Sequence, residues 1–174
     1  MEALHPKGTA RLLHLCLPHS RMELGETWPN TELHTWLHGA WDGLPAPTLT
    51  LLLYPPSPPD PTLSLCPPPD WSMQDGAALP PHAVVRLVVI DGTWRKSRKM
   101  LYLNPALQQL PRLPLLELPT GQYHIRKAHQ PGQLSTLEAT WAALRQLEPD
   151  NSTLASLLHA MNSLQNQYRS SASL

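Results

Sequence analysis

The chain has 174 residues, 41% of them hydrophobic, and its 13 basic and 13 acidic residues cancel. This length suits one domain with a proper core, and no apolar run approaches the ~20 residues that a membrane-spanning helix requires. The N-terminus lacks the basic and then apolar pattern of a signal peptide, so we expect a cytoplasmic protein without a membrane partner.

The charges are unevenly distributed along the chain. The segment from Arg86 to Lys127 contains eight basic and two acidic residues, a net charge of +6, which leaves −6 on the remainder. A local basic surface on a neutral protein attracts phosphate, as in nucleic acid. The four cations between Arg95 and Lys99 fit such a surface, but they equally fit a solvated helix face.

The cysteines and histidines give little support for a metal centre. The two cysteines, Cys16 and Cys66, form no CxxC pair, which excludes a zinc ribbon or a redox motif of that kind. His34 and His38 have helical spacing, but the sequence offers no third ligand close by. We therefore expect no metal site.

In chain order, residues 10–17 form an apolar run that predicts a first buried strand. Residues 34–41 fit either a short helix or an extended segment. Residues 48–54 predict a second strand, which ends at Pro55 because proline cannot donate to a β-ladder. Residues 55–81 form a proline-rich connection, stiff and extended or partly disordered, within a single domain spanning residues 1–174.

Residues 84–90 are the clearest strand, β-branched and apolar enough to be buried on both faces of a parallel sheet. The turn Asp91-Gly92-Thr93 then leads into a helix over residues 94–103. Asp91 is either a carboxylate poised as a general base at the end of the strand or the cap of that helix, and Thr93 can equally be the cap. Trp94 is either a core residue or a wall for a purine or pyrimidine ring.

Further helices and strands alternate after this turn. We expect a helical turn or two over residues 105–110, a strand over residues 113–118, and a final helix beyond residue 150. Between them, Ser135 and Glu138 form a capping-box pattern that opens another helix. This alternation predicts an α/β domain with a mainly parallel sheet.

Two segments near the C-terminal half carry further candidate site residues. After the turn at Gly121, Arg126 either pairs with a surface acid or grips a phosphate or carboxylate through two hydrogen bonds. The helix that begins at Ser135 has free backbone N–H groups in its first turn. These groups either bond only to the capping side chains or also bind an anionic group of a ligand. The sequence lacks GxGxxG, GxxxxGK[ST] and GxSxG, so it carries none of these common nucleotide-binding or hydrolase loops.

In this order and spacing, these motifs resemble the DTW-domain family, in a short form without the cysteine-rich segment that many members carry before the domain. The resemblance covers roughly residues 5–145. The segments that carry it are His5-Pro6, Arg11-Leu12-Leu13, Leu53-Tyr54-Pro55, Asp91-Gly92-Thr93-Trp94 with the basic helix, Tyr123-His124-Ile125-Arg126-Lys127, and Leu134-Ser135-Thr136-Leu137-Glu138-Ala139.

This resemblance implies a tRNA-uridine aminocarboxypropyltransferase. Such an enzyme transfers the 3-amino-3-carboxypropyl group of S-adenosyl-L-methionine to N3 of a uridine in tRNA. It also implies a SPOUT-like, knotted fold that holds the cofactor. We expect a monomer or a weak homodimer with tRNA as its substrate. Two alternatives stay open: an S-adenosylmethionine-dependent RNA methyltransferase of SPOUT-like fold, and a non-catalytic RNA-binding module.

The implied site divides its residues by role, with Asp91 taking the N3 proton of uridine as general base. The catalytic residues are Asp91, Thr93 and Trp94. The cofactor-binding residues are Tyr54, Pro55, Tyr123, Arg126, Leu134, Ser135, Thr136 and Glu138. The RNA-binding residues are Arg95, Lys96, Arg98, Lys99 and Lys127.

Overall fold

The structure, a computed structural model, describes residues 9–41, 43–55, 60–70, 79, 82–116, 134–157, 159, 160 and 163. The described residues fall into two compact units. One lies within Leu24–Leu116, and the other combines both ends of the chain, within Met1–Glu23 and Glu117–Leu174. The expected single domain over residues 1–174 stays a prediction.

The unit Leu24–Leu116 is built on a small parallel sheet. Its strands are β1 (Leu49–Leu53), β2 (Val85–Val89) and β3 (Arg112–Leu113), in the order β2-β1-β3. Both pairings are parallel, and β1 and β2 match residue for residue along their whole length. The expected α/β class with a parallel sheet is confirmed in this unit, whereas the SPOUT-like knot stays a prediction.

The strands differ in burial, and this corrects the expectation for β2. In the central strand β1, Thr50, Leu51 and Leu52 are buried. Every residue of β2 is only half-buried, although its sequence predicted burial on both faces. Among the described strands β2 pairs with β1 alone, so it lies at an edge of the sheet, where one flank is open.

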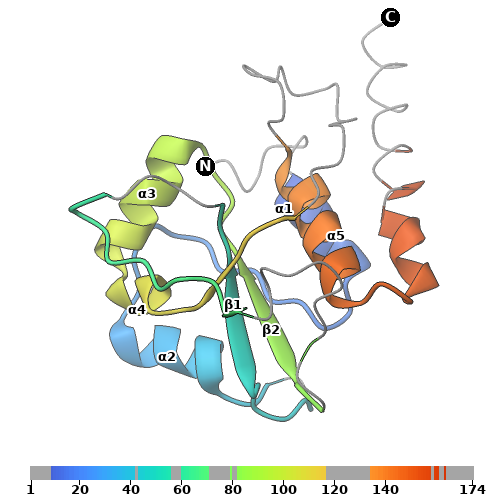
Figure 1. Ribbon diagram of the computed structural model, residues 1–174, viewed down its shortest axis with the longest axis horizontal. Helices are drawn as coiled ribbons and strands as arrows, with labels where there is room; N and C mark the ends of the chain where they lie inside the picture. Colours follow the sequence, from blue (N-terminus) through green and yellow to red (C-terminus); the bar gives the residue numbers. More distant parts are fainter. Residues whose placement is uncertain are drawn as a thin grey trace, which may run out of the picture. The chain divides into compact units, whose positions relative to one another are not determined.

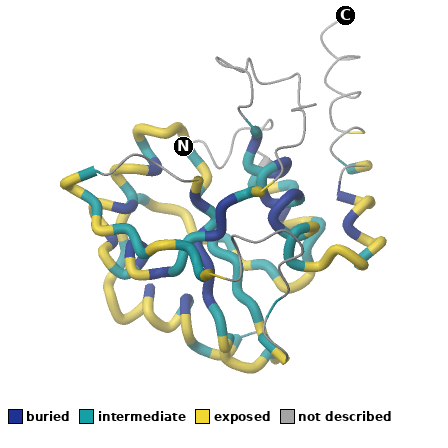
Figure 2. The backbone as a smooth tube through the Cα atoms, viewed as in Figure 1, coloured by how far each residue is buried: buried dark blue, intermediate teal, exposed yellow. Residues whose placement is uncertain are grey.

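Three helices lie beside β1 and β2 in this unit: α2 (Asn30–His38), α3 (Trp94–Leu103) and α4 (Pro105–Gln108) (Figure 1). The undecided segment at residues 34–41 is therefore mostly helical. Figure 2 shows buried residues interrupting the exposed surface of these helices. The helices and β1 share one hydrophobic core, whose buried members are Leu33, Leu37, Leu52, Tyr54, Leu101, Leu107 and Leu110.

Prolines shape the rest of this unit. Of the described residues 113–116 of the predicted strand 113–118, Leu113 alone is in a strand, because Pro114 follows and cannot donate to a ladder. Residues 117 and 118 lie outside the described residues. Within the proline-rich connection, the described stretch 60–66 is anchored to the core. Leu63 and Leu65 pack against the core, and the backbone N–H of Cys66 donates to the Gln108 carbonyl at 2.8 Å.

The other unit pairs the helices α1 (Thr9–Cys16) and α5 (Thr136–Leu147). The strand predicted over residues 10–17 was wrong, because α1 is a helix there. A short apolar run fits the repeat of a helix as well as that of a strand. In α1 the residue that faces inward is Leu13, which is buried with Leu137 while Leu15 is 73% exposed.

The start of α5 follows the predicted capping box. The Ser135 side chain accepts from the Glu138 N–H at 3.2 Å, and the Glu138 carboxylate accepts from the Ser135 N–H at 2.8 Å. After α5, a short 3-10 turn (Ser152–Leu154) is capped by the side chain of Asn151. None of the helices in the described part of the chain has the length and apolar character needed to cross a membrane.

Candidate active site at the carboxyl end of β2

The turn Asp91-Gly92-Thr93 delivers an exposed carboxylate to one edge of the sheet. Leu53 and Val89 are register partners, so Tyr54 after β1 and Asp91 after β2 leave the sheet at the same edge. Open parallel sheets bind ligands at this carboxyl edge. Gly92 allows the tight turn, because a Cβ there would lie 3.3 Å from the Cβ of Lys96.

Thr93, rather than Asp91, caps α3. The Thr93 side chain accepts from the backbone N–H of Lys96 at 3.4 Å, and its carbonyl accepts from the Ser97 N–H at 2.8 Å. The alternative reading of Asp91 as the cap is therefore wrong. The Thr93 hydroxyl keeps its own proton, which it can donate to a neighbouring acceptor.

Trp94 offers an aromatic face to solvent and is supported from below by Tyr54. The two rings meet edge to face, with centroids 5.9 Å apart and planes at 79°. Trp94 is 53% exposed, whereas Tyr54 is 5% exposed and belongs to the core. Burial raises the pKa of the Tyr54 hydroxyl above its ordinary value. Tyr54 thus positions Trp94, and Pro55 beside it is exposed.

The basic helix α3 is partly neutralised by acids from distant segments. Arg98 forms an ion pair with Asp60, and the Lys99 Nζ lies 2.5 Å from a carboxylate oxygen of Glu26. The pKa of Glu26 is lowered, chiefly by its hydrogen bond to Lys99 and by the charge of Lys99. The pKa of Asp60 is lowered by hydrogen bonds from Thr62 and then by Arg98.

These pairs reduce the basic surface that the charge distribution predicted. Two more of its cations are turned toward the protein: Arg86 donates to the Trp36 carbonyl at 2.7 Å, and Arg112 donates to the Cys66 carbonyl at 2.9 Å. Arg95 is exposed on α3 and Lys96 is half-buried. Among the described cations of the segment Arg86–Lys127, those that face solvent thus lie on α3.

Asn104 is a positioning residue that the sequence reading missed. It is 1% exposed, and its side-chain amide donates to the carbonyls of Met100 at 2.6 Å and Glu26 at 2.9 Å. Its side-chain oxygen accepts from the Trp28 N–H at 3.2 Å. Asn104 therefore ties the segment that carries Glu26 to the end of α3. The sequence signal that could have identified it is the pair Asn104-Pro105, an asparagine before a proline at the end of α3.

The second motif segment, Leu134 to Glu138, lies in the other unit. Ser135 and Glu138 are each 4% exposed, and their side chains are engaged in the capping box. Thr136 and Leu134 are half-buried, and the Thr136 carbonyl accepts from the Thr140 hydroxyl at 2.7 Å. The side chains of Ser135 and Glu138 cap the helix, so a ligand at this helix start would meet chiefly backbone N–H groups.

The structure brings together only part of the predicted site. Tyr54, Asp91, Thr93 and Trp94 gather at one edge of one sheet. Tyr123, Arg126 and Lys127 lie outside the described residues. Among the residues that are described, no three histidine, cysteine, aspartate or glutamate side chains cluster closely enough to hold a metal ion.

Comparisons with known proteins agree with these motifs. Residues 1–169 match the DTW domain. A 78-residue stretch is 33% identical to a protein of Drosophila melanogaster named tRNA-uridine aminocarboxypropyltransferase 2. That stretch covers 45% of this chain and 31% of the relative, so the chain spans about a third of the relative's length. No solved structure matches the chain.

Proposed function

The chain belongs to the DTW domain family, and on this premise we propose that it is a tRNA-uridine aminocarboxypropyltransferase. The proposed substrate is a uridine in tRNA, modified at N3, and the proposed donor is S-adenosylmethionine. The family match over residues 1–169 and the name of the fly relative support the reaction class.

One observation carries the assignment of the site. An exposed carboxylate, Asp91, and an exposed aromatic face, Trp94, stand three residues apart at the carboxyl edge of a parallel sheet. The helix that follows carries four cations and begins at this edge. A base, a ring-binding surface and phosphate-binding cations are the groups that chemistry on a nucleic-acid base requires.

The described residues fit the donor in one respect. Trp94 presents a flat ring held by the buried Tyr54, which suits an adenine or a uracil ring. When bound, S-adenosylmethionine supplies the 3-amino-3-carboxypropyl group, whose γ-carbon bonds to N3 as its bond to sulfur breaks. The α5 backbone and Arg126 stay candidates for the donor's anionic carboxylate.

Asp91 is proposed to take the proton from N3 of the target uridine. Removing this proton frees the nitrogen lone pair for bond formation. Thr93, whose hydroxyl proton is free to be donated, would hold the Asp91 carboxylate or the O4 of uracil in place. Because N3 faces the base-pairing edge, the target uridine has to leave its stack to reach Asp91.

The cations of α3 are proposed to meet tRNA phosphates and to supply affinity with little choice of sequence. Arg98 and Lys99 would exchange their carboxylate partners for phosphates on binding. The two ion pairs are solvent-exposed on the basic side, with Arg98 and Lys99 side chains 59% and 58% exposed. Exposed pairs contribute little, so their exchange costs little.

Replacing Asp91 by asparagine tests the proposed base. We expect Asp91→Asn to lower the transfer rate by roughly 10²–10⁴-fold while leaving donor affinity nearly unchanged, because only the proton acceptor is lost. Asp70→Asn is the matched control, since Asp70 is also exposed but belongs to the proline-rich connection and not to the segment that follows a strand of the sheet. A wild-type rate in Asp91→Asn would remove Asp91 from the base role.

A further inference from the structure

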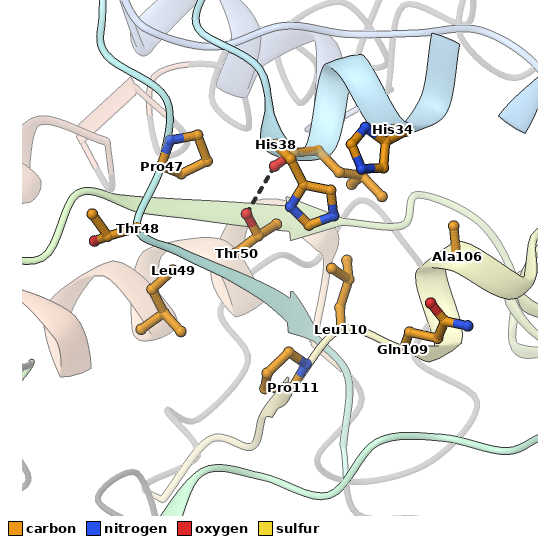
Figure 3. A pocket seen from close by; sticks show the side chains of 11 residues that line it. His34, His38, Pro47, Thr48, Leu49, Thr50, Ala106, Gln109, Leu110 and Pro111 are labelled. Atoms are coloured by element: carbon orange, nitrogen blue, oxygen red, sulfur yellow. Dashed lines mark hydrogen bonds between the residues drawn. The ribbon is translucent and has the colours of Figure 1, made fainter. Parts of the chain in front are cut away.

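A pocket of about 340 Å³ lies at the opposite edge of the same sheet from Asp91. It is bordered by the amino ends of β1 and β3 and by α2 and α4, and therefore lies wholly within the unit Leu24–Leu116 (Figure 3). Its floor is apolar and includes Ala106 and Leu110, whereas the Leu49 side chain points to the other face of β1 (Figure 3). Its polar groups include His34, His38 and Gln109, and among the described residues that line it none is acidic.

The two histidines are one helical turn apart on α2 and share the rim of this pocket. Their ring centroids lie 4.9 Å apart, with the planes tilted by 54°. Residues four apart on a helix project from the same face, so both rings can contact one ligand group. Behind them Thr50 donates to the Leu37 carbonyl at 2.8 Å, which ties α2 to the central strand (Figure 3).

The surroundings of these histidines are rich in donors and cations. Arg86, the register partner of Thr50, lies 4.5 Å from the centroid of the Trp41 ring and acts electrostatically on His38. The Trp41 indole N–H is buried and has no hydrogen-bond partner within the described part of the chain. The pKa of His38 is lowered by its burial and then by the charges of His34 and Arg86. Among the described residues, the charged groups that act on His38 are therefore both basic.

We propose that this pocket is a second binding site, which takes a small organic anion. Its phosphate or carboxylate group accepts hydrogen bonds from the ring N–H groups of both His34 and His38, and its body rests on the apolar floor around Ala106 and Leu110. Charged hydrogen bonds from imidazolium groups to such an anion are short and strong. This site is independent of the transferase reaction proposed above.

Charge favours an anion over a metal cation at this position. A His-x₃-His pair on a helix also suits zinc or nickel, and this is the competing occupant. The fixed positive charge of Arg86 acts on His38, so it disfavours a second cation there and favours an anion.

Binding of the anion is expected to take up protons. The anion raises the lowered pKa of His38, so its affinity rises as the pH falls through the pKa of the bound state. The affinity at low pH therefore exceeds that at high pH, and the ratio grows with the rise in the pKa of His38 on binding. The other titratable groups on the described elements around His38 are Glu32 and His34 of α2, Arg86 of β2 and Arg112 of β3. Glu32 lies two residues from His34, on another side of the helix.

Histidine ring resonances of the full chain, followed by ¹³C-edited NMR, test the site. The probes are uridine 5′-monophosphate, benzoate, inorganic phosphate and Ni²⁺. We expect the two organic anions to shift the signals of His34 and His38. The double variant His34→Gln/His38→Gln should weaken their binding by about tenfold or more. His14→Gln is the control, because His14 is an exposed histidine of α1 in the other unit.

The NMR titrations distinguish binding of an organic anion from binding of a metal ion and from no binding. Signal changes confined to His34 and His38, lost in the double variant and kept in the control, support the proposal. No change with either organic anion, or a response to Ni²⁺ alone, overturns it. If inorganic phosphate binds as tightly as the organic anions, the organic part of the ligand adds no affinity. That result would overturn the proposed contact with the apolar floor.

Discussion

Replacing Trp94 by alanine removes the exposed ring that the site offers to a base or an adenine. Trp94 is 53% exposed, so roughly half of a large aromatic surface, about 100 Å², is buried in the folded chain. At ~25 cal/mol per Å², with ~1 kcal/mol for the edge-to-face contact, the truncation costs about 3.5 kcal/mol of folding free energy at most. The exposed half of the ring is what a ligand would cover.

The expected effect on binding follows from that exposed face. Stacking of a base on an aromatic ring contributes ~1–3 kcal/mol, so Trp94→Ala should weaken binding of S-adenosylmethionine or of tRNA by roughly 5- to 150-fold. Calorimetry measures the first affinity and fluorescence anisotropy the second. Trp94→Phe keeps a ring and should retain most of the affinity.

Tyr102→Ala is the matched control for this substitution. Tyr102 is 62% exposed and lies on the same helix, but it stands near the other end of α3 from the sheet edge. We expect both of its affinities to stay at the wild-type level. If folded Trp94→Ala binds both ligands as the wild type does, Trp94 is a partly buried surface residue without a ring-binding role.

Three further predictions follow from the described contacts. Lys96→Ala combined with Lys99→Ala should reduce the salt slope of tRNA affinity by up to about two, and a flat salt response in the wild type would mean that α3 is only a solvated face. Ser135→Ala should lower the free energy of unfolding by about 1 kcal/mol, with Ser135→Asn restoring most of it; unchanged stability in denaturant titrations of Ser135→Ala would contradict the capping role. The folded pKa of Glu26 is lowered, so its contribution to stability is present above its unfolded pKa and is lost as the pH falls through the folded pKa. Glu26→Gln should remove that part of the acid-induced loss, and an ordinary carboxyl titration of Glu26 by NMR would refute the pair with Lys99.

The elements with strong local signals were predicted correctly from the sequence. The β-branched run before Asp91 became β2, and the Ser135–Glu138 capping box opened α5 as expected. These signals involve neighbouring residues, because a cap is made within one turn of the chain. The Asp91 turn and the following helix, which define the candidate site, were read from the same kind of local pattern.

The errors came from features that depend on distant parts of the chain. The run at residues 10–17 has apolar residues on both periods, and only packing of Leu13 with Leu137 made it a helix. The ion pairs of Arg98 and Lys99 join residues 38 and 73 positions apart, so composition alone overestimated the basic surface. Contacts of such separation are set by the tertiary fold.

The role of Tyr54 shows the same limit within the site. The resemblance of Leu53-Tyr54-Pro55 to the DTW-domain family placed it among the cofactor-binding residues. The structure buries Tyr54 in the core, where its ring meets that of Trp94 edge to face, and its cofactor-binding role stays a prediction. Which of the two aromatic residues is exposed depends on how the strand end and the helix pack, and no pattern in either segment specifies this.

The central claim is the transfer of an aminocarboxypropyl group to uridine in tRNA, and product analysis tests it most directly. The full chain would be incubated with labelled S-adenosylmethionine and total tRNA, and the nucleosides and the cleaved donor identified by mass. The proposed function predicts 3-(3-amino-3-carboxypropyl)uridine with methylthioadenosine. Methylated nucleosides with S-adenosylhomocysteine would show a methyltransferase instead, and an unchanged donor with tRNA still bound would show a non-catalytic RNA-binding module.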